Sequence, residues 1–376
     1  MSAKTVVLTV NAGSSSLRLA LYRGRELDSL ASWHGEADSA EAFDVAGWVR
    51  QHGVARPDVV AHRVVHGGAD LVAPCRVNAA VEAVIERLVP LAPLHNPAAL
   101  RGIRTVREAW GPGLLQVAVF DTGFYAELPA AAARYALPDL GPGEPLRRYG
   151  FHGIAHQAML GAWRGEQPAA SAGARSISLQ LGAGCSMTAA IDGKPVETSM
   201  GFTPLEGLVM ATRSGDVDPG LLLYLLKERG QTVADLERLL NHEAGLKGLS
   251  GITGDMRELL ASPAPAAALA VDAYCHRLRK YLGAYLAVLG GADAILFGGG
   301  VGENAAVIRE RVLTGLDFAG VRLDCALNGS LNRARNQSAA RSVTAIHADD
   351  SAVAIWVVAV DEARVLARIG LELLGA

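Results

Sequence analysis

The chain has 376 residues, which is too long for one hydrophobic core of ordinary size, so the sequence predicts two domains. Half of the residues are hydrophobic, and 35 basic residues are balanced by 38 acidic ones, for a formal net charge of −3. This balance gives no electrostatic reason to expect nucleic acid or an anionic membrane as a partner.

Three further features bear on the cellular compartment. The N-terminus shows no signal-peptide pattern, because an apolar strand follows directly after Lys4. The longest apolar run, Ala352 to Val360, is about half of the roughly 20 residues that span a bilayer. The cysteines stand far apart, with no C-x-x-C pair and no metal-ligand spacing: Cys75, Cys185, Cys275 and Cys325. We therefore expect a soluble, cytoplasmic protein with reduced thiols and no membrane partner.

The first recognisable element is a short buried strand, Thr5 to Val10, that runs into the loop Asn11 to Ser16. A turn of this composition can offer several N–H groups and hydroxyls to one anion, although an ordinary Gly/Ser hairpin turn has the same sequence pattern. The apolar run Leu17 to Tyr22 fits the return strand of a hairpin. The segments Ser176–Ser186 and Ala292–Asn304 repeat the pattern of strand and small-residue loop, which favours phosphate binding.

The next strand, Val59 to Gly68, carries Arg63 in the middle of an apolar run. A buried arginine is costly unless an anion meets it, so this residue is a candidate anion binder. The alternative is an edge strand on which Arg63 faces water. A helix that ends at Pro90 and a second helix that begins at Asn96 follow, and the loop between them presents His95.

A further strand ends on Asp121, and the carboxyl ends of strands are where open α/β sheets build their sites. A turn-forming aspartate is the alternative at this position. Residues 126–150 are rich in Ala, Pro and Gly and fit a domain junction. His152 and His156, in the first turns of the next expected helix, have metal-ligand spacing, but no third ligand accompanies them and we do not favour a metal there.

The second half contains a loop segment around Arg213, a largely helical stretch, and the third strand and loop. The glycines of that loop leave N–H groups available near a helix N-terminus, as in many phosphate sites. No Walker A motif occurs, and the dinucleotide fingerprint fails because Gly298 and Gly300 are followed by Glu303. The protein-kinase motifs are missing too. Several phosphate-type loops without these motifs point to a nucleotide clamped between two related domains.

Nine short motifs occur in the order VNAGSSSLR, AHRVVHGG, LAPLHNP, VFDTGF, RRYGFHG, FTPLEGL, TRSGDVDP, GDMRE and GGGVGEN. Together they resemble the acetate kinase family, within the superfamily of sugar kinases, actin and the large heat-shock chaperones. The resemblance extends from Asn11 to Asp350, essentially the whole chain. It implies an α/β protein with two duplicated ribonuclease H-like (actin-like ATPase) domains and the nucleotide in the interdomain cleft. The expected domains are residues 1–124 plus 352–376 and residues 125–351.

The resemblance also implies a reaction: reversible, direct in-line transfer of a phosphoryl group from ATP to acetate, which gives acetyl phosphate and ADP and uses Mg²⁺. A homodimer is implied as well. A propionate or butyrate kinase, an enzyme that uses pyrophosphate, and a non-catalytic nucleotide-binding homologue stay open as alternatives. A carboxylate is already an anionic nucleophile, so such an enzyme must chiefly bring two anions together and neutralise charge.

By similarity to the family, Arg63 and His95 bind the substrate, and Arg213 and His152 stabilise the transition state. Asp121 takes the family's active-site aspartate position and organises Mg²⁺ or its water. The small or apolar acyl pocket maps onto Val65, Leu94, Phe151 and Pro204. Such a pocket distinguishes one methylene by only ~1–3 kcal/mol, so acetate and propionate are both candidate substrates.

The remaining positions that the resemblance assigns bind metal and nucleotide. Asn11, and Asp350 at the expected start of the last helix, fall near the metal. The nucleotide positions are Arg18, Gln180, Leu181, Gly182, Ala183, Gly184, Asp255, Met256, Arg257, Gly300, Val301, Gly302, Glu303 and Asn304.

The sequence departs from the family pattern in the second loop, where the family usually reads H-L-G-N-G-A-S. Here Gln180 replaces the histidine, Ala183 the asparagine and Cys185 the alanine. The loss of one donor at a transition-state oxyanion typically costs ~10²–10³ in rate, so we expect a slower or retuned enzyme. Arg18 replaces a lysine, which keeps the charge but changes its shape, and Asp350 fills a glutamate position.

Overall fold

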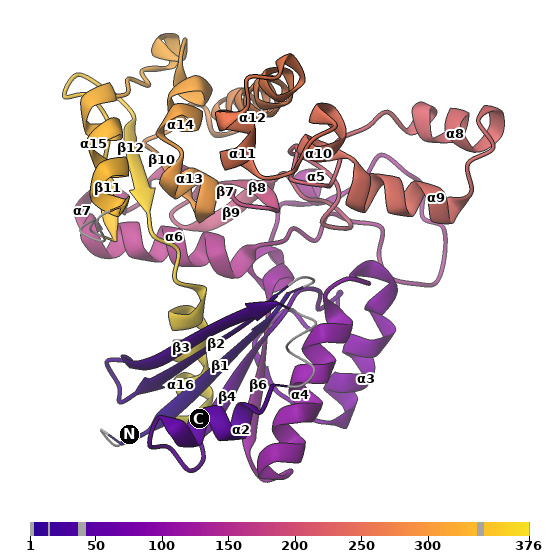
Figure 1. Ribbon diagram of the computed structural model, residues 1–376, viewed down its shortest axis with the longest axis vertical. Helices are drawn as coiled ribbons and strands as arrows, with labels where there is room; N and C mark the ends of the chain where they lie inside the picture. Colours follow the sequence, from indigo (N-terminus) through magenta and orange to yellow (C-terminus); the bar gives the residue numbers. More distant parts are fainter. Residues whose placement is uncertain (1–3, 14–15, 37–42, 337–341, 376) are drawn as a thin grey trace. The chain divides into compact units, whose positions relative to one another are not determined.

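The computed structural model describes residues 4–13, 16–36, 43–336 and 342–375 (Figure 1). The chain forms two compact units, each with a six-stranded sheet. The first unit comprises Met1–Ala126, Pro138–Ile154 and Asp361–Ala376, and the second comprises Glu127–Leu137 and Ala155–Val360. The chain leaves the second unit after Val360, and the C-terminal segment from Asp361 belongs to the first unit.

The sheet of the first unit has the strand order β3-β2-β1-β4-β6-β5. Strands β1, β2 and β3 form an antiparallel meander, β1, β4 and β6 are parallel, and the short β5 pairs antiparallel with β6. The bounds are β1 (Val6–Ala12), β2 (Ser16–Arg23), β3 (Asp28–Glu36), β4 (Val59–Val64), β5 (Cys75–Arg76) and β6 (Leu115–Phe120).

The sheet of the second unit has the order β9-β8-β7-β10-β12-β11, which is the order of the first with six added to each number. The parallel and antiparallel pairings repeat as well. The bounds are β7 (Arg175–Leu181), β8 (Cys185–Ile191), β9 (Lys194–Thr198), β10 (Ala294–Gly298), β11 (Val343–Ala345) and β12 (Ala354–Val358). This repetition confirms the predicted duplicated α/β fold.

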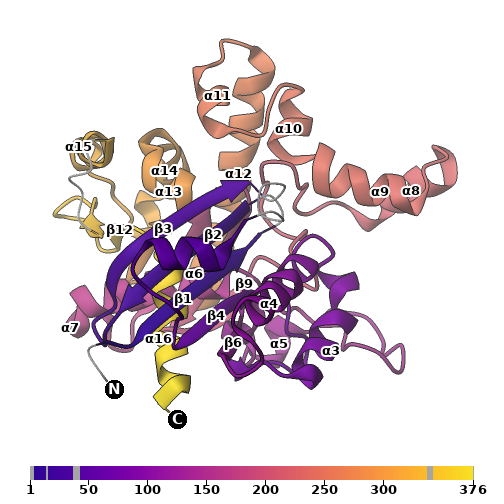
Figure 2. The ribbon, with the colours of Figure 1, turned by 60° about the horizontal axis from the view of Figure 1, so that its bottom comes forward.

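Helices cover both faces of the first sheet (Figure 2). Side chains alternate between the two faces of a strand, so Leu8 and Val10 pack toward Trp48 on one face while Val7 packs with Leu366 on the other. The helices of this unit are α2 (Val45–Gln51), α3 (Ala79–Arg87), α4 (Asn96–Trp110) and α16 (Glu362–Gly375), with the short turns η1 (Val89–Leu91) and η2 (Asp121–Tyr125).

The second unit is richer in helices, and its longest, α12 (Pro265–Leu289), packs on β7 and β8 and against two shorter helices, α10 and α11. The others are α5 (Ala130–Ala133), α7 (Pro168–Ser171), α8 (Pro219–Glu228), α9 (Val233–Arg238), η3 (Leu239–Glu243), α10 (Gly245–Ser250), α11 (Met256–Ala261), α13 (Gly299–Asn304), α14 (Ala306–Leu313), η4 (Asp317–Ala319) and α15 (Cys325–Asn336). Helix α6 (Gly153–Glu166) begins at the end of the first unit and continues into the second. None of the described helices is long and apolar enough to cross a bilayer.

The C-terminal segment corrects one expectation. Asp350, which we expected at the start of the last helix, precedes β12, and the helix itself begins at Glu362. The reason lies in the apolar run between them: its β-branched residues form β12, which pairs in parallel with β10 in the second sheet. The start of the last helix predicted from the sequence is therefore wrong.

Candidate active site

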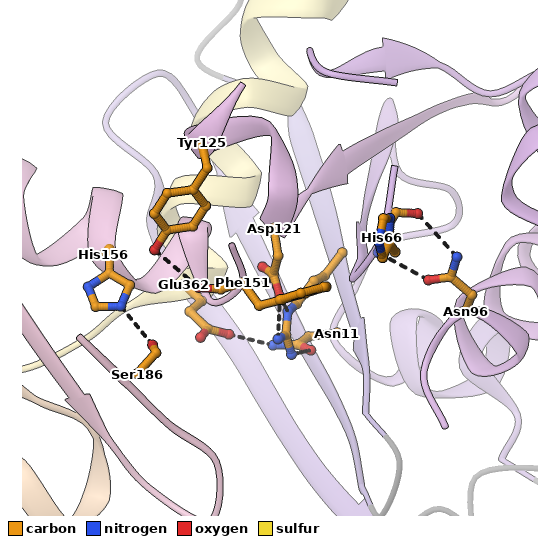
Figure 3. A network of polar contacts seen from close by, with 10 residues as sticks. Asn11, His66, Asn96, Asp121, Tyr125, Phe151, His156, Ser186 and Glu362 are labelled. Atoms are coloured by element: carbon orange, nitrogen blue, oxygen red, sulfur yellow. Dashed lines mark hydrogen bonds and ion pairs between the residues drawn. The ribbon is translucent and has the colours of Figure 1, made fainter. Parts of the chain in front are cut away.

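A cluster of polar side chains lies at the carboxyl ends of β1, β4 and β6, three adjacent strands of the first unit (Figure 3). Arg63 on β4 donates to Asp121 through Nη2 at 2.6 Å and through Nε at 3.1 Å. Its Nη1 donates to Oδ1 of Asn11 on β1 at 3.0 Å, and Nδ2 of Asn11 donates to Oε2 of Glu362 at 2.7 Å. The structure thus brings together three predicted site residues and one that was not predicted.

The Arg63–Asp121 pair is removed from water. The Asp121 side chain is 1% exposed and that of Arg63 is 13% exposed. Strand β4 lies inside the sheet, so the edge-strand alternative for Arg63 is wrong, and Asp121 is the anion that its burial requires. Burial raises the pKa of Asp121, and the positive charge of Arg63 opposes that rise. Burial acts to lower the pKa of Arg63, but the Asp121 and Glu362 carboxylates outweigh it and raise the pKa, so the guanidinium stays charged.

Glu362 is the functional candidate that the sequence analysis missed. It is the first residue of α16, and Asp361 before it accepts a hydrogen bond from the Arg364 N–H at 2.9 Å, which caps the helix. A carboxylate just past a buried strand is the same signal that pointed to Asp121. Asp350 was expected in this role, but its exposed carboxylate belongs to the second unit and binds Arg322.

The predicted acyl-pocket and substrate residues of the first unit are positioned by the loops beside this cluster. Val65 and Phe151 are buried, and the Phe151 carbonyl accepts a hydrogen bond from the Tyr125 hydroxyl at 3.1 Å. Leu94 and His95 are half-buried just before α4. The fourth pocket residue, Pro204, lies in the second unit.

His152 lies between Phe151 and the start of α6 with a backbone φ of +56°, in the left-handed region. A non-glycine residue held there costs of order 1–3 kcal/mol and is a feature typical of functional sites. The next residue must be glycine, because a Cβ on Gly153 would lie 2.0 Å from the Asp121 carbonyl oxygen. The sequence therefore fixes the His152 backbone directly beside the segment that carries Asp121.

Arg213 lies half-buried in the second unit, and its Nη1 donates to the carbonyl oxygen of Pro204 at 2.5 Å. The loop that carries it is held to its neighbours by backbone contacts: the carbonyl of Arg213 accepts from the Met210 N–H at 3.2 Å. This hydrogen bond thus joins Pro204, which was predicted to line the substrate pocket, to Arg213, which was predicted to stabilise the transition state.

The second unit contains a cavity of about 790 Å³ that gathers eight of the predicted nucleotide residues. It is walled by the turn after β7, by the start of α11 and by α13, and its remaining lining is mostly apolar apart from Tyr274. An apolar wall with a few polar groups at its edge suits a nucleoside. The predicted residues in the lining are Gly182, Ala183, Asp255, Met256, Arg257, Gly300, Val301 and Asn304.

Gln180 stands beside the turn that leads into this cavity. It is the next-to-last residue of β7, and its Oε1 atom is buried without a hydrogen-bond partner among the described residues. Leu181 is buried after it, and the N–H of Gly182 donates to the Gly184 carbonyl at 3.1 Å to close the turn. A buried polar atom without a partner marks a place where a ligand or water can bind.

The other predicted nucleotide residues play different parts. The Gly302 carbonyl accepts from buried Arg309 at 2.7 Å, and the Glu303 carboxylate accepts from the Val360 N–H at 3.1 Å. Arg18 is exposed on β2, opposite Asn11 in the strand register. In the first small-residue loop, Ser14 and Ser15 lie outside the described residues.

His156, the partner of His152 in the spacing that fits a metal, is buried in the second unit. Its two ring nitrogens lie 2.7 Å from the Ser178 hydroxyl and 2.8 Å from the Ser186 hydroxyl, and burial lowers its pKa to about 3. Across the parts of the chain that the structure describes, no group of three or more His, Cys, Asp or Glu residues is arranged to hold a metal ion.

Two copies of one sheet, with small-residue turns after corresponding strands and a nucleoside-sized cavity at one of them, define the duplicated actin-like ATPase class. The model of the acetokinase family matches residues 49–368, and the chain belongs to that family. It is therefore a kinase, and the family implies that it uses ATP and ADP.

Individual relatives agree with this assignment. The chain is 44% identical over 314 residues to the acetate kinase of Chloroherpeton thalassium. The aligned segment covers 82% of this chain and 74% of that protein. The crystal structure of Porphyromonas gingivalis acetate kinase superposes with a TM-score of 0.86 at 33% identity, over 98% of this chain and 100% of that one. A propionate kinase from Francisella tularensis gives a TM-score of 0.88 at 33% identity, over 98% and 99% of the two chains.

Proposed function

We propose that this enzyme is an acetate kinase that phosphorylates acetate reversibly with ATP. An acetate oxygen attacks the γ-phosphorus in line, the bond from that phosphorus to the β–γ bridging oxygen breaks, and acetyl phosphate and ADP form. The observation that carries the proposal is the buried Arg63–Asp121 pair, with Asn11 and Glu362, at the carboxyl ends of adjacent strands. We take the two compact units as the two catalytic domains predicted from the sequence.

Arg63 suits the binding of a small carboxylate. A guanidinium has five N–H donors, and Asp121 and Asn11 accept from only part of this set. Asp121 fixes the plane of the guanidinium, so its remaining donors are oriented before the substrate arrives. His95, half-buried at the N-terminus of α4, is the second polar group that we assign to the substrate.

Arg213 and His152 are assigned to the transferred phosphoryl group. Charge spreads over its equatorial oxygens during the transfer, and fixed cations and donors stabilise that charge. The hydrogen bond to the Pro204 carbonyl holds the Arg213 side chain, and the left-handed backbone at His152 fixes the place from which its side chain extends, which supports these roles.

The side-chain oxygens of the polar cluster in the first unit are suitable ligands for Mg²⁺. This ion prefers oxygen ligands and binds through one or two carboxylates together with substrate phosphates. Glu362, Asp121 and Asn11 supply such oxygens within one cluster, and we assign the ion to them rather than to Asp350. When bound, Mg²⁺ neutralises charge on the phosphate oxygens. Glu362, Asp121 and Asn11 would hold the ion, and Asp121 and Asn11 also orient Arg63 through the hydrogen bonds that they accept from it.

Propionate is the second candidate substrate. The three pocket residues of the first unit, Val65, Leu94 and Phe151, are all apolar, so an added methylene meets no polar group. The resemblance to the Francisella propionate kinase structure favours the same candidate. Discrimination of one methylene is worth only ~1–3 kcal/mol, so we expect the two acids to differ by at most about 200-fold in kcat/KM.

We also infer a cytoplasmic homodimer. The location is supported by the four free cysteines, which are typical of a reducing compartment, and the dimer by α8, a ten-residue helix with no buried residue. It exposes 46% of Leu221, 54% of Leu223 and 46% of Tyr224, an apolar surface that a second copy of the chain would cover. Leu223→Glu should then shift the sedimenting species from dimer to monomer, while Phe318→Glu, at an 83% exposed residue of η4, should not. A monomeric wild type would contradict the proposal.

The experiment that tests the activity is the trapping of acetyl phosphate with hydroxylamine. Purified protein is incubated with ATP, Mg²⁺ and acetate, and the hydroxamate is measured against Arg213→Ala as the control. Product well above this control supports the proposal, and product at the level of the control refutes it. Propionate, butyrate and pyrophosphate in parallel reactions identify the preferred acid and donor. ADP binding without product from any acid would favour the non-catalytic alternative.

A further inference from the structure

Glu303 lies in the nucleotide segment, but its carboxylate binds the chain elsewhere. It belongs to α13, whose residues Gly300, Val301 and Asn304 line the cavity, whereas Glu303 itself is not in the lining. Its Oε1 accepts a hydrogen bond from the backbone N–H of Val360 at 3.1 Å. Val360 lies two residues beyond the end of β12, past the residue pairs given for that strand with β10 and β11, and the Glu303 carboxylate accepts from its N–H.

Helix α13 is also fixed from its other side. Arg309, which is fully buried, donates to the carbonyl oxygens of Gly302 at 2.7 Å and Glu303 at 3.0 Å. The guanidinium is itself held by Asn328, whose Oδ1 accepts from Nε at 2.8 Å. Arg309 thus connects the end of α13 to α14 and α15, and we expect a ligand that contacts Gly300 or Val301 to act on α13 as a unit that includes the Glu303 carboxylate.

Val360 is also the last residue of the second unit. Two residues later Glu362 begins α16 and accepts the 2.7 Å hydrogen bond from Asn11. Two residues of chain span at most ~7 Å, so a displacement of Val360 has little slack before it reaches Glu362. One hydrogen bond thus connects the wall of the nucleotide cavity to the short segment that leads to the Asn11–Arg63–Asp121 cluster.

We propose that Glu303 is a positioning residue, which fixes the place of Glu362 according to whether the nucleotide cavity is occupied. The inference rests on the proposed function only in that Glu362 belongs to the catalytic cluster. The competing role for Glu303 is direct action of its charge on the nucleotide or its metal. The two roles differ in what they require: positioning needs the reach and the acceptor oxygen of the side chain, whereas a charge effect needs the charge.

Two substitutions separate these requirements. Glu303→Gln keeps the length and one acceptor oxygen but removes the charge, and Glu303→Asp keeps the charge but shortens the side chain by one methylene. Loss of a hydrogen bond to a charged acceptor is worth about 10-fold or more, so we expect kcat/KM for acetate in Glu303→Asp to fall at least about 10-fold below that of Glu303→Gln. The dissociation constant of ADP, measured by calorimetry with Mg²⁺, should differ between the two variants by less than about threefold.

Hydrogen exchange of the Val360 amide tests the connection without any catalysis. Saturating ADP with Mg²⁺ should slow this exchange about fivefold or more in the wild type and in Glu303→Gln, and should leave it unchanged in Glu303→Asp. If the wild type makes no acetyl phosphate, the proposed function fails and this measurement alone decides the role of Glu303. Unchanged Val360 exchange in the wild type overturns the inference, as does a larger loss of activity in Glu303→Gln than in Glu303→Asp. If Glu303→Asp does not fold, the exchange in the wild type and Glu303→Gln still gives the answer.

Discussion

Asn11 and Gln180 occupy the same position in the two copies of the sheet. Each is the next-to-last residue of a strand, β1 or β7, that turns into an antiparallel hairpin and pairs in parallel with its other neighbour. The carboxamide of Asn11 accepts from Arg63 and donates to Glu362. The Oε1 of Gln180 is buried without a partner among the residues that the structure describes.

In the first site the polar side chains form hydrogen bonds with one another, whereas in the second site a ligand must supply the hydrogen-bond partner that the described residues do not. In the first unit the positive charge of Arg63 and the negative charge of Asp121 are paired inside the protein, so removal of one member leaves a buried group uncompensated. In the second unit, the polar groups of the turn after β7 and of the cavity wall pair with one another less. A substitution there should therefore weaken ligand binding more than it lowers the free energy of unfolding.

The largest effect is expected for Arg63→Ala, because it removes a substrate donor and also leaves the Asp121 carboxylate buried alone. The broken pair should cost about 3–5 kcal/mol of unfolding free energy. Arg213→Ala should lower kcat by ~10²–10³ with little change in stability, since the Arg213 side chain is only half-buried. Thermal unfolding and the hydroxamate assay measure both quantities. Equal losses of stability in the two variants would contradict the contrast between the units.

The next comparison sets Asn11→Ala against Gln180→Ala. Asn11 bridges Arg63 and Glu362, so its truncation should lower kcat by about 10²-fold. No described residue donates a hydrogen bond to Gln180 Oε1, so truncation of this side chain should cost about 10-fold or less and should act mainly on KM for ATP. Steady-state kinetics with ATP and acetate varied separately gives both constants. A mild effect of Asn11→Ala would return the first loop to the role of an ordinary turn.

A gain of function is expected from restoring the family residues in the second loop. Gln180→His and Ala183→Asn together restore the two side chains of the family pattern, one in the cavity lining and one just before it in the chain, and if both donate to the phosphates kcat should rise by about 10-fold or more. Ala183 is exposed, so the added asparagine has room. Ser186→Ala is a poor control because that hydroxyl lies beside His156, and the exposed Leu137→Ala is better suited. An unchanged kcat would show that the phosphates are held by other groups.

Much of this site could be predicted from local rules. An arginine inside an apolar strand made Arg63 a candidate anion binder, and a carboxylate at a strand end made Asp121 a candidate site residue, while an exposed edge strand and a turn-forming aspartate stayed open as alternatives. Small residues after β7 and β10 predicted two walls of the cavity. Glu362 escaped because the motifs were followed only to Asp350, and the apolar run beyond it hid one further strand before the last helix. That Gln180 Oε1 has no partner among the described residues depends on packing between distant segments, which sequence patterns do not describe.

The last effect, which is absent at neutral pH, concerns acid stability, and each unit contains a buried histidine whose pKa is lowered: His62 in the first and His156 in the second. Burial lowers the pKa of His62 to about 4 and that of His156 to about 3, while the usual value is 6.5. The unfolded chain therefore binds these protons first as the pH falls. The stabilisation is complete above about pH 6.5 and is lost progressively down to the folded pKa, at about 1.4 kcal/mol per pH unit for each histidine.

Because His62 lies in the first unit and His156 in the second, their contributions can be read separately by hydrogen exchange of the strand amides. His62→Asn should reduce the pH dependence of β4 protection between pH 6.5 and 4 and leave that of β7 as it is. His156→Asn should do the reverse between pH 6.5 and 3. Burial is the cause of both lowered pKa values: the hydrogen bond between His62 Nε2 and Gln116 Oε1 at 2.7 Å opposes the shift in the first unit, and His156 lies between two serine hydroxyls in the second. If either variant changed the pH dependence of amide protection in both β4 and β7, the two units would unfold together. Stability measurements could then not separate the units, and the contrast between Asn11 and Gln180 would have to be tested by ligand binding alone.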